Sequence, residues 1–136
     1  MFNDHITVVS FFYSSCQLIC PTIIKRLKLI QKQYIDNSKV QLISFSITPD
    51  IDTPDVLLRY AKQENIDGAK WNLLTGHLPD IVQLARHSFF SEAVMEKGFN
   101  NNIHTEMLFL VDSSSQIRGL YNSSVRRDLE LLEQDI

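Results

Sequence analysis

The chain has 136 residues, a length typical of one domain, and we expect residues 1–136 to form a single unit around its own hydrophobic core. Thirteen Lys and Arg against sixteen Asp and Glu give a formal net charge of −3, which argues against nucleic acid as a partner. The most apolar stretch, ITVVSFFY at 6–13, is far shorter than the roughly 18 residues that cross a bilayer.

The first half of the chain alternates strand patterns with amphipathic helix patterns. Residues 6–13 are β-branched and aromatic, which predicts a buried strand that leads into the sequence SSC. From Pro21 onward, apolar residues recur at helical spacing, which predicts an amphipathic helix. A second buried strand is expected at 40–47. A loop and a second helix follow, with Thr53 as the N-cap and Pro54 at the first helical position.

The second half of the chain is less regular. KWNLLTG at 70–76 predicts a short extended segment, and 79–87 predicts another helix. Residues 88–103 mix aromatic residues with glycine and asparagine, so we expect a partly ordered insertion there. EMLFLVD, SSSQ and IRGLY at 106–121 predict a β-hairpin, and 125–134 predicts a closing helix.

The order of these elements predicts the fold class. Strands that alternate with helices imply a parallel pair with right-handed crossovers, and the late hairpin adds antiparallel strands. The order βαβα, a middle helix and then ββα is that of an α/β protein with a thioredoxin-like fold. We therefore expect a central mixed β-sheet flanked by helices.

The only two cysteines, Cys16 and Cys20, lie in SSCQLICPT at 14–22. If Pro21 lies in the first turn of the helix, Cys20 is at the positive end of the helix dipole, where unpaired backbone N–H groups stabilise a thiolate. Cys16 is four residues earlier on the incoming loop, within the Cα separation that a disulfide requires. The spacing therefore permits both a reactive thiolate and a disulfide.

Three interpretations of this pair remain open from the residues alone. The cysteines can be unrelated core residues or one inert bridge, because free cysteine often behaves as a small hydrophobe. They can be the couple of a thiol-disulfide oxidoreductase, although a thioredoxin motif has two intervening residues and this one has three. They can belong to a metal site suited to Cu(I) or zinc. A structural zinc site, however, needs a fourth strong ligand that no further cysteine supplies.

Four segments resemble one known family. FFYSSCQLICPT resembles the C-x3-C-P signature of the Sco/SenC family, copper-binding thioredoxin-like proteins of cytochrome c oxidase assembly. ISFSITPDIDTPDVLLRYAK resembles the family's second strand, its Pro- and Asp-containing loop and the following helix, and WNLLTG resembles its next short segment. IHTEMLFLVDSSSQIRGLY resembles the segment in which a histidine precedes the late hairpin. Together these segments cover nearly the whole chain in the family's order.

The resemblance implies a copper site. The family's two cysteine ligands correspond to Cys16 and Cys20, and its histidine ligand corresponds to His104. Two thiolates and one imidazole suit Cu(I), and Cu(II) would recruit a fourth donor. Asp50 and Asp52 are candidates for that donor, although capping of the loop is the simpler explanation of these carboxylates.

The resemblance also implies a function and partners. It implies a copper metallochaperone, not an enzyme in the ordinary sense, that helps to assemble the dinuclear copper site of cytochrome c oxidase. Its partner is then the copper-site subunit of the oxidase or another copper or thiol protein. The alternatives are a thiol-disulfide oxidoreductase that uses Cys16 and Cys20 to reduce an oxidase subunit, and a copper or redox sensor.

The resemblance implies a location as well, although the sequence departs from the family in two places. The resemblance implies the bacterial periplasm, with attachment to the inner membrane, or the mitochondrial intermembrane space. The membrane anchor and the hairpin that usually precede the first strand are absent from this sequence, so we expect a trimmed chain or a shortened gene product. Thr48 stands where an acidic residue commonly precedes the loop proline, which puts a carboxylate's role there in doubt.

Overall fold

The structure is a computed structural model that describes residues 4–12, 20–46, 50–76, 80, 107–114, 116–123 and 125–136; at 20–22 it describes the backbone alone. Within these ranges the first elements are strand β1 (Ile6–Phe12), helix α1 (Cys20–Gln33), strand β2 (Val40–Ser46) and helix α2 (Pro54–Gln63). Strands β3 (Trp71–Leu74), β4 (Met107–Val111) and β5 (Ile117–Asn122) and helix α5 (Arg126–Asp135) follow. The predicted helix at 79–87, apart from residue 80, and the predicted insertion at 88–103 lie outside the described residues.

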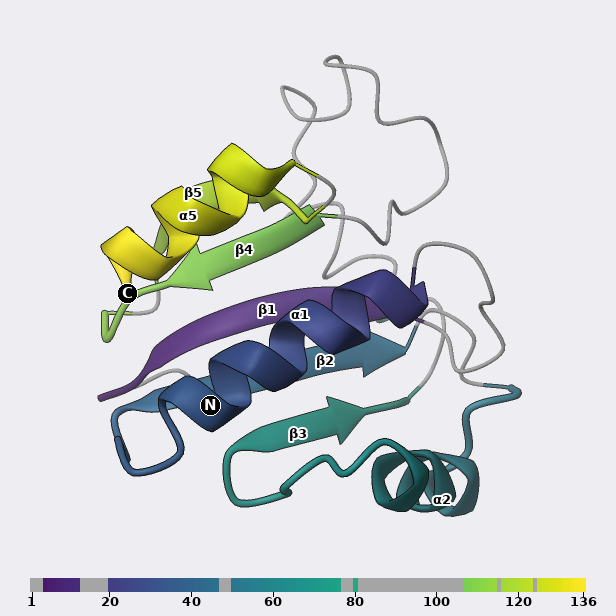
Figure 1. The fold of residues 1–136 in the computed structure, drawn as a ribbon. Helices are drawn as coiled ribbons and strands as arrows, with labels where there is room; N and C mark the ends of the chain where they lie inside the picture. The colour runs from purple at the N-terminus through teal and green to yellow at the C-terminus, as the bar shows by residue number, and fades with distance from the viewer. Residues whose placement is uncertain are drawn as a thin grey trace.

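The described strands form one mixed sheet in the order β3-β2-β1-β4-β5 (Figure 1). β1 pairs in parallel with β2, and β2 pairs in parallel with β3, whereas β4 is antiparallel to both β1 and β5. The predicted mixed sheet is therefore confirmed, and its parallel part has three strands because the short segment at β3 joins the predicted pair.

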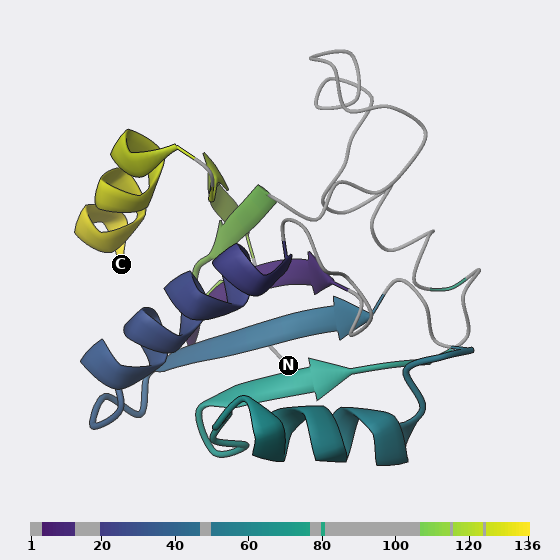
Figure 2. The same ribbon diagram turned by 45° about the vertical axis from the view of Figure 1, so that its right-hand side comes forward.

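The three described helices pack on one face of the sheet (Figure 2). α1 and α5 share one apolar cluster with the sheet, and α2 adds Leu57 against Phe12 of β1. The buried members of the shared cluster are Val8, Ile23, Ile24, Leu27, Ile30, Leu42, Trp71, Leu108, Leu110, Tyr121 and Leu132. The four members from α1 have the helical spacing that the sequence predicted, so the amphipathic character of α1 is confirmed.

The other face of the sheet is also apolar and buried, with an aromatic group at its centre. Phe11 stacks on Phe45 with ring centroids 5.6 Å apart, and it meets Phe109 edge-on at 6.1 Å. All three rings are at least nine-tenths buried. Because successive side chains of a strand alternate between faces, β1 contributes to the core on both sides and reads as a continuous apolar run.

A buried polar network crosses the centre of the sheet. Ser10 of β1 lies opposite Ser44 of β2, and their hydroxyl oxygens are 2.5 Å apart. The indole N–H of Trp71 in β3 donates to the Ser44 hydroxyl at 2.9 Å. Each polar group thus has a partner in a part of the core that excludes water, and the network helps to fix the register of three strands.

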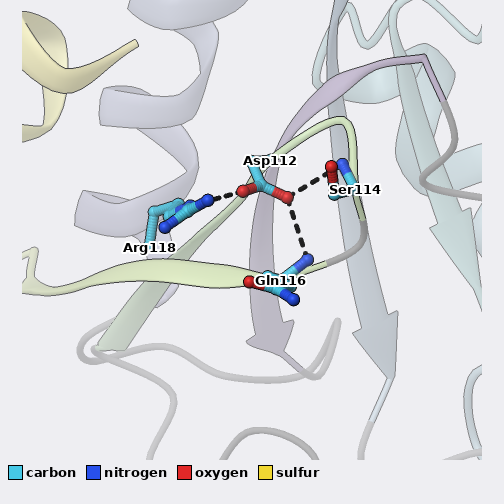
Figure 3. Close-up of polar contacts among 4 residues, drawn as sticks. All are labelled: Asp112, Ser114, Gln116 and Arg118. Carbon is cyan, nitrogen blue, oxygen red and sulfur yellow. Dashed lines mark hydrogen bonds and ion pairs between the residues drawn. The ribbon is translucent and has the colours of Figure 1, made fainter.

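Local signals set the start of α2 and the turn between β4 and β5. The Thr53 hydroxyl accepts from the backbone N–H of Val56 at 3.4 Å, as predicted for an N-cap followed by proline. In the hairpin, the Asp112 carboxylate accepts from the backbone N–H groups of Ser114 and Gln116 at 2.9 and 3.0 Å and pairs with Arg118 (Figure 3). The hydrogen bond from the backbone N–H of Gln116 is the largest cause that lowers the pKa of Asp112, and the hydrogen bond from the Arg118 side chain is the second. The antiparallel pairing of β4 with β5 confirms the predicted hairpin.

Candidate metal centre

The carboxyl ends of β1 and β2 and the start of α1 meet at one edge of the sheet. β1 and β2 are parallel and α1 connects them, so α1 runs back across the sheet and its first residue lies where both strands end (Figure 1). That first residue is Cys20, and Pro21 lies in the first turn. The predicted position of Cys20 at the start of the helix is therefore confirmed.

β4 begins at the same edge. The pairing of Ser10 with Leu108 in an antiparallel register places Met107, the first residue of β4, beside the end of β1. The chain that leads into β4 thus arrives at the edge where β1 ends and α1 begins. This arrangement brings the start of β4 to two segments, the end of β1 and the start of α1, that lie far from it in the sequence.

Of the three predicted ligands, the structure places one. Cys20 is placed through its backbone, whereas Cys16 and His104 lie outside the described residues. In the sequence, Cys16 follows the last residue of β1 by four positions, and His104 precedes the first residue of β4 by three. The flanking elements of both residues therefore reach the edge at which Cys20 begins α1.

The start of α1 favours a negatively charged group. No acidic side chain lies in its first turn, and the first backbone N–H groups of a helix have no partner within the helix itself. These groups and the helix dipole stabilise an anion at this end, which is the condition that lowers the pKa of a cysteine thiol. The start of α1 is therefore an environment that favours an anion.

A buried carboxylate is hydrogen-bonded to the last residue of β2. The Ser46 hydroxyl, at the last residue of β2, donates to the Asp52 carboxylate at 2.6 Å, and both side chains are fully buried. Asp50 in contrast is exposed. This bond ties the end of β2 to the residue before the N-cap of α2, which agrees with the loop-capping interpretation of Asp52. The sequence offered no signal for Ser46 as its partner.

Two absences concern only the described ranges. There, no group of three His, Cys, Asp or Glu side chains is arranged to hold a metal ion. Nor does any helix in those ranges have the length and apolar character needed to cross a bilayer.

Together, the mixed sheet, its parallel βαβ units and a cysteine at the first residue of α1 define a thioredoxin-like protein. The model of the SCO1/SenC family matches residues 1–134. The chain belongs to the SCO1/SenC family.

Individual relatives agree with this assignment. The SCO1 protein homolog of Bacillus subtilis (strain 168) is 28% identical over 122 residues, which is 88% of this chain and 63% of the relative. The chain thus spans less than two thirds of the length of that relative. The SCO2-like protein RP587 of Rickettsia prowazekii (strain Madrid E) is 27% identical, over 98% of this chain and 67% of its own length.

Solved structures share the fold. A SCO1/SenC family lipoprotein from Bacillus anthracis str. Ames has a TM-score of 0.80 and 26% identity, over 98% of this chain and 80% of that one. BsSco, a Sco family cytochrome c oxidase assembly protein in which a disulfide switch was identified, has a TM-score of 0.79 and 25% identity, with 98% and 79% covered. Yeast Sco1 with copper bound shares the fold at a TM-score of 0.68 and 17% identity, with 98% and 79% covered. These matches confirm the thioredoxin-like fold class.

Proposed function

We propose that this chain is a copper metallochaperone domain, spanning 1–136, that binds copper through Cys16, Cys20 and His104. It passes the ion to the dinuclear copper site of cytochrome c oxidase. The observation that carries the proposal is the meeting of the end of β1, the start of α1 and the start of β4 at one edge of the sheet. Membership of the SCO1/SenC family supports the same assignment, and so does the shared fold with yeast Sco1, whose structure has copper bound.

Chain length limits how far the two remaining ligands lie from that edge. An extended chain covers at most about 3.6 Å per residue, so the Cα of Cys16 is within about 14 Å of the end of β1. By the same limit, the Cα of His104 is within about 11 Å of Met107, the first residue of β4. Both residues therefore have the reach to meet Cys20 at one metal ion.

The donor set fits copper as a cargo. Two thiolates are soft ligands that suit Cu(I), and neutral imidazole suits copper in either oxidation state. Copper competes with protons for all three ligands, so the affinity for copper decreases as the pH is lowered. A disulfide between Cys16 and Cys20 removes both thiolate donors, and the reduced chain is therefore the form that holds copper. Release proceeds as ligands of the acceptor displace these three one at a time.

The proposed partner and location follow from the same assignment. The acceptor is the copper-site subunit of the oxidase or another copper or thiol protein. We place the domain in the bacterial periplasm beside the inner membrane, in keeping with the lipoprotein relative. The mitochondrial intermembrane space is the alternative.

An anaerobic titration of the fully reduced protein with Cu(I) and, separately, Cu(II) tests the proposal. We expect one equivalent to bind, with thiolate-to-copper charge-transfer absorption for Cu(II) and loss of tight binding in Cys16→Ser and His104→Ala. His5→Ala is the matched control, because His5 precedes β1 at the opposite edge of the sheet. The absence of tight binding by folded, reduced parent protein would show that the proposal is wrong.

A second function, thiol-disulfide exchange, is favoured by the position of Cys20 at the start of α1. A low-pKa attacking thiol and a resolving partner are what that chemistry requires. Turnover on a disulfide substrate that persists in His104→Ala, together with weak copper binding by the parent, would favour an oxidoreductase over a metallochaperone.

A further inference from the structure

The solvent face of α1 carries a group of basic side chains around one exposed leucine. Lys25, Arg26 and Lys32 are exposed, and 53% of Leu29 is exposed. Residues three and four positions apart share a helix face, so Leu29 lies between Lys25 and Arg26 on one side and Lys32 on the other. We call these four residues the α1 stripe.

The charge of the α1 stripe is not balanced within the helix. α1 contains four basic residues and no acidic residue, while the other 122 residues carry nine basic and sixteen acidic side chains, a net charge of −7. Lys28 of α1 pairs with Glu64 at 2.8 Å, but the three cations of the stripe form no ion pair with any residue in the described ranges.

Helix stability does not explain this concentration of charge. No two cations of the stripe stand three or four positions apart, so they do not repel one another along the helix face, and the nearby Lys28 is paired with Glu64. The core packing of α1 comes from its opposite, apolar face. The exposed cations of the α1 stripe are therefore not needed for the core packing of the helix and are open to a binding partner of opposite charge.

The stripe leads directly from the candidate metal centre. α1 rises about 1.5 Å per residue, so Lys25 and Lys32 lie about 7.5 Å and 18 Å along the helix axis from Cys20. α1 covers one face of the sheet (Figure 2). The side chains of the stripe are exposed to solvent. A protein surface that lies on the stripe is therefore adjacent to the edge where α1 begins.

We propose that the α1 stripe docks a carboxylate-rich surface of the copper-accepting protein, an inference that rests on the proposed function. Complementary charge speeds the association of two proteins and fixes their relative orientation, and Leu29 supplies an apolar contact between the cations of the stripe. A protein fits the stripe better than a lipid surface does. The stripe has three cations, whereas polybasic lipid-binding segments carry about four to eight. An interfacial helix also needs a broad apolar face, and α1 buries its apolar face in the core.

Charge reversal tests the docking surface. The test variant is Lys25→Glu/Arg26→Glu/Lys32→Glu. The matched control is Lys39→Glu/Arg59→Glu/Lys62→Glu, which changes the net charge equally at other exposed positions. The probe is the purified, immobilised copper-site domain of the oxidase subunit, and reduced, copper-free protein is passed over it at several salt concentrations.

We expect the association rate constant at low salt to fall tenfold or more in the test variant and less than about threefold in the control. The parent's rate should fall with added salt, and the test variant should be nearly insensitive to it. Leu29→Ala, which keeps every charge, should raise the dissociation rate severalfold. Circular dichroism establishes that each variant is folded.

The outcomes separate this inference from the proposed function. Equal rates for the test and control variants, or no binding by the parent, would overturn the docking surface. So would stripe-dependent binding to phosphatidylglycerol vesicles without binding to the oxidase domain. One equivalent of copper bound by the same samples would leave the proposed function standing in each of these cases. Stripe-dependent docking without copper binding would instead support the surface and contradict copper delivery.

Discussion

At residue 119, β5 has space only for glycine. A Cβ added at Gly119 would lie 2.2 Å from the hydroxyl oxygen of Tyr121 and 2.5 Å from the ring carbon that bears it. Tyr121 cannot move away freely, because its side chain belongs to the core cluster and its hydroxyl donates to Asp135 at 2.6 Å. The close approach of the ring to the backbone therefore explains the glycine.

Gly119→Ala should lower the free energy of unfolding by about 1–3 kcal/mol, because the ring must leave its packed position. Urea unfolding measures the change. Gly68→Ala is the control, since no atom lies within 4 Å of its added Cβ. Equal stability of the two variants would show that the ring moves without cost.

Because the pKa of Tyr121 is raised in the folded state, we expect the free energy of unfolding to fall at alkaline pH. Burial first, and then the hydrogen bond to Asp135, raise the pKa of Tyr121 above its ordinary value of 10. The unfolded chain then loses this proton at a lower pH than the folded chain does. The contribution to stability is complete below pH 10 and falls as the pH rises further, by at most about 1.4 kcal/mol per pH unit.

Tyr121→Phe should therefore flatten the decline in unfolding free energy above pH 10. Parallel urea unfolding of parent and variant between pH 8 and the alkaline limit of folding measures the difference, and Tyr34→Phe is the control. An unchanged slope in Tyr121→Phe would mean that this phenol ionises equally in both states.

Among the elements, α1 contacts the loop between α2 and β3 through the side chain of Gln31 as well as through the Lys28–Glu64 ion pair. The amide of Gln31 donates to the backbone carbonyl of Asn65 at 3.2 Å and accepts from the backbone N–H of Asp67 at 2.8 Å. Only 8% of Gln31 is exposed, so water has little access to these groups. The side chain thus satisfies two backbone groups of a loop that the helix would otherwise desolvate.

Gln31→Met should cost about 1–3 kcal/mol, because it leaves the backbone carbonyl of Asn65 and the backbone N–H of Asp67, both partly buried by the helix, without partners. Gln33→Met, at an exposed position of the same helix, should change stability by less than about 0.5 kcal/mol. Chemical denaturation gives both values. If the two variants were equally stable, solvent must replace the lost partners at this site.

The sequence predicted the helix α1 but not the contacts of its side chains with the loop between α2 and β3. Periodicity located β1, β2, α1 and the hairpin because these signals are local, and Thr53 with Pro54 marked the start of α2. The pairing of β3 with β2 was not predicted, because four residues carry no register signal. Gln31 and the Ser10–Ser44–Trp71 network were missed as well, since their partners lie far away in the sequence.

The candidate site divides in the same way. Proline after Cys20 was enough to place that cysteine at the start of α1, and the structure confirms it. No local pattern links Cys16 and Cys20 to His104, because the link depends on the antiparallel pairing of β4 with β1. Only resemblance to a family proposed the histidine, and its role stays a prediction.

For the whole molecule, copper should act as a cross-link between the start of α1 and the chain that enters β4. A ligand that binds only the folded state stabilises it by about 2.7 kcal/mol when its free concentration is a hundred times its dissociation constant. Reduced protein with one equivalent of Cu(I) should therefore melt several degrees higher than copper-free protein. A Cu(I) chelator should reverse the shift, and lower pH should shrink it because protons compete for the thiolates.

Calorimetry of matched histidine variants decides whether the cross-link includes the late segment. His5→Ala should keep the copper-dependent rise in melting temperature, because His5 lies at the opposite edge of the sheet. His104→Ala should lose most of it, since the two sulfurs that remain bind copper weakly and lie within one short segment that is not joined to β4. A full rise in His104→Ala would place copper on the cysteine segment alone, and the edge where β1, α1 and β4 meet would then contribute fold but no third ligand.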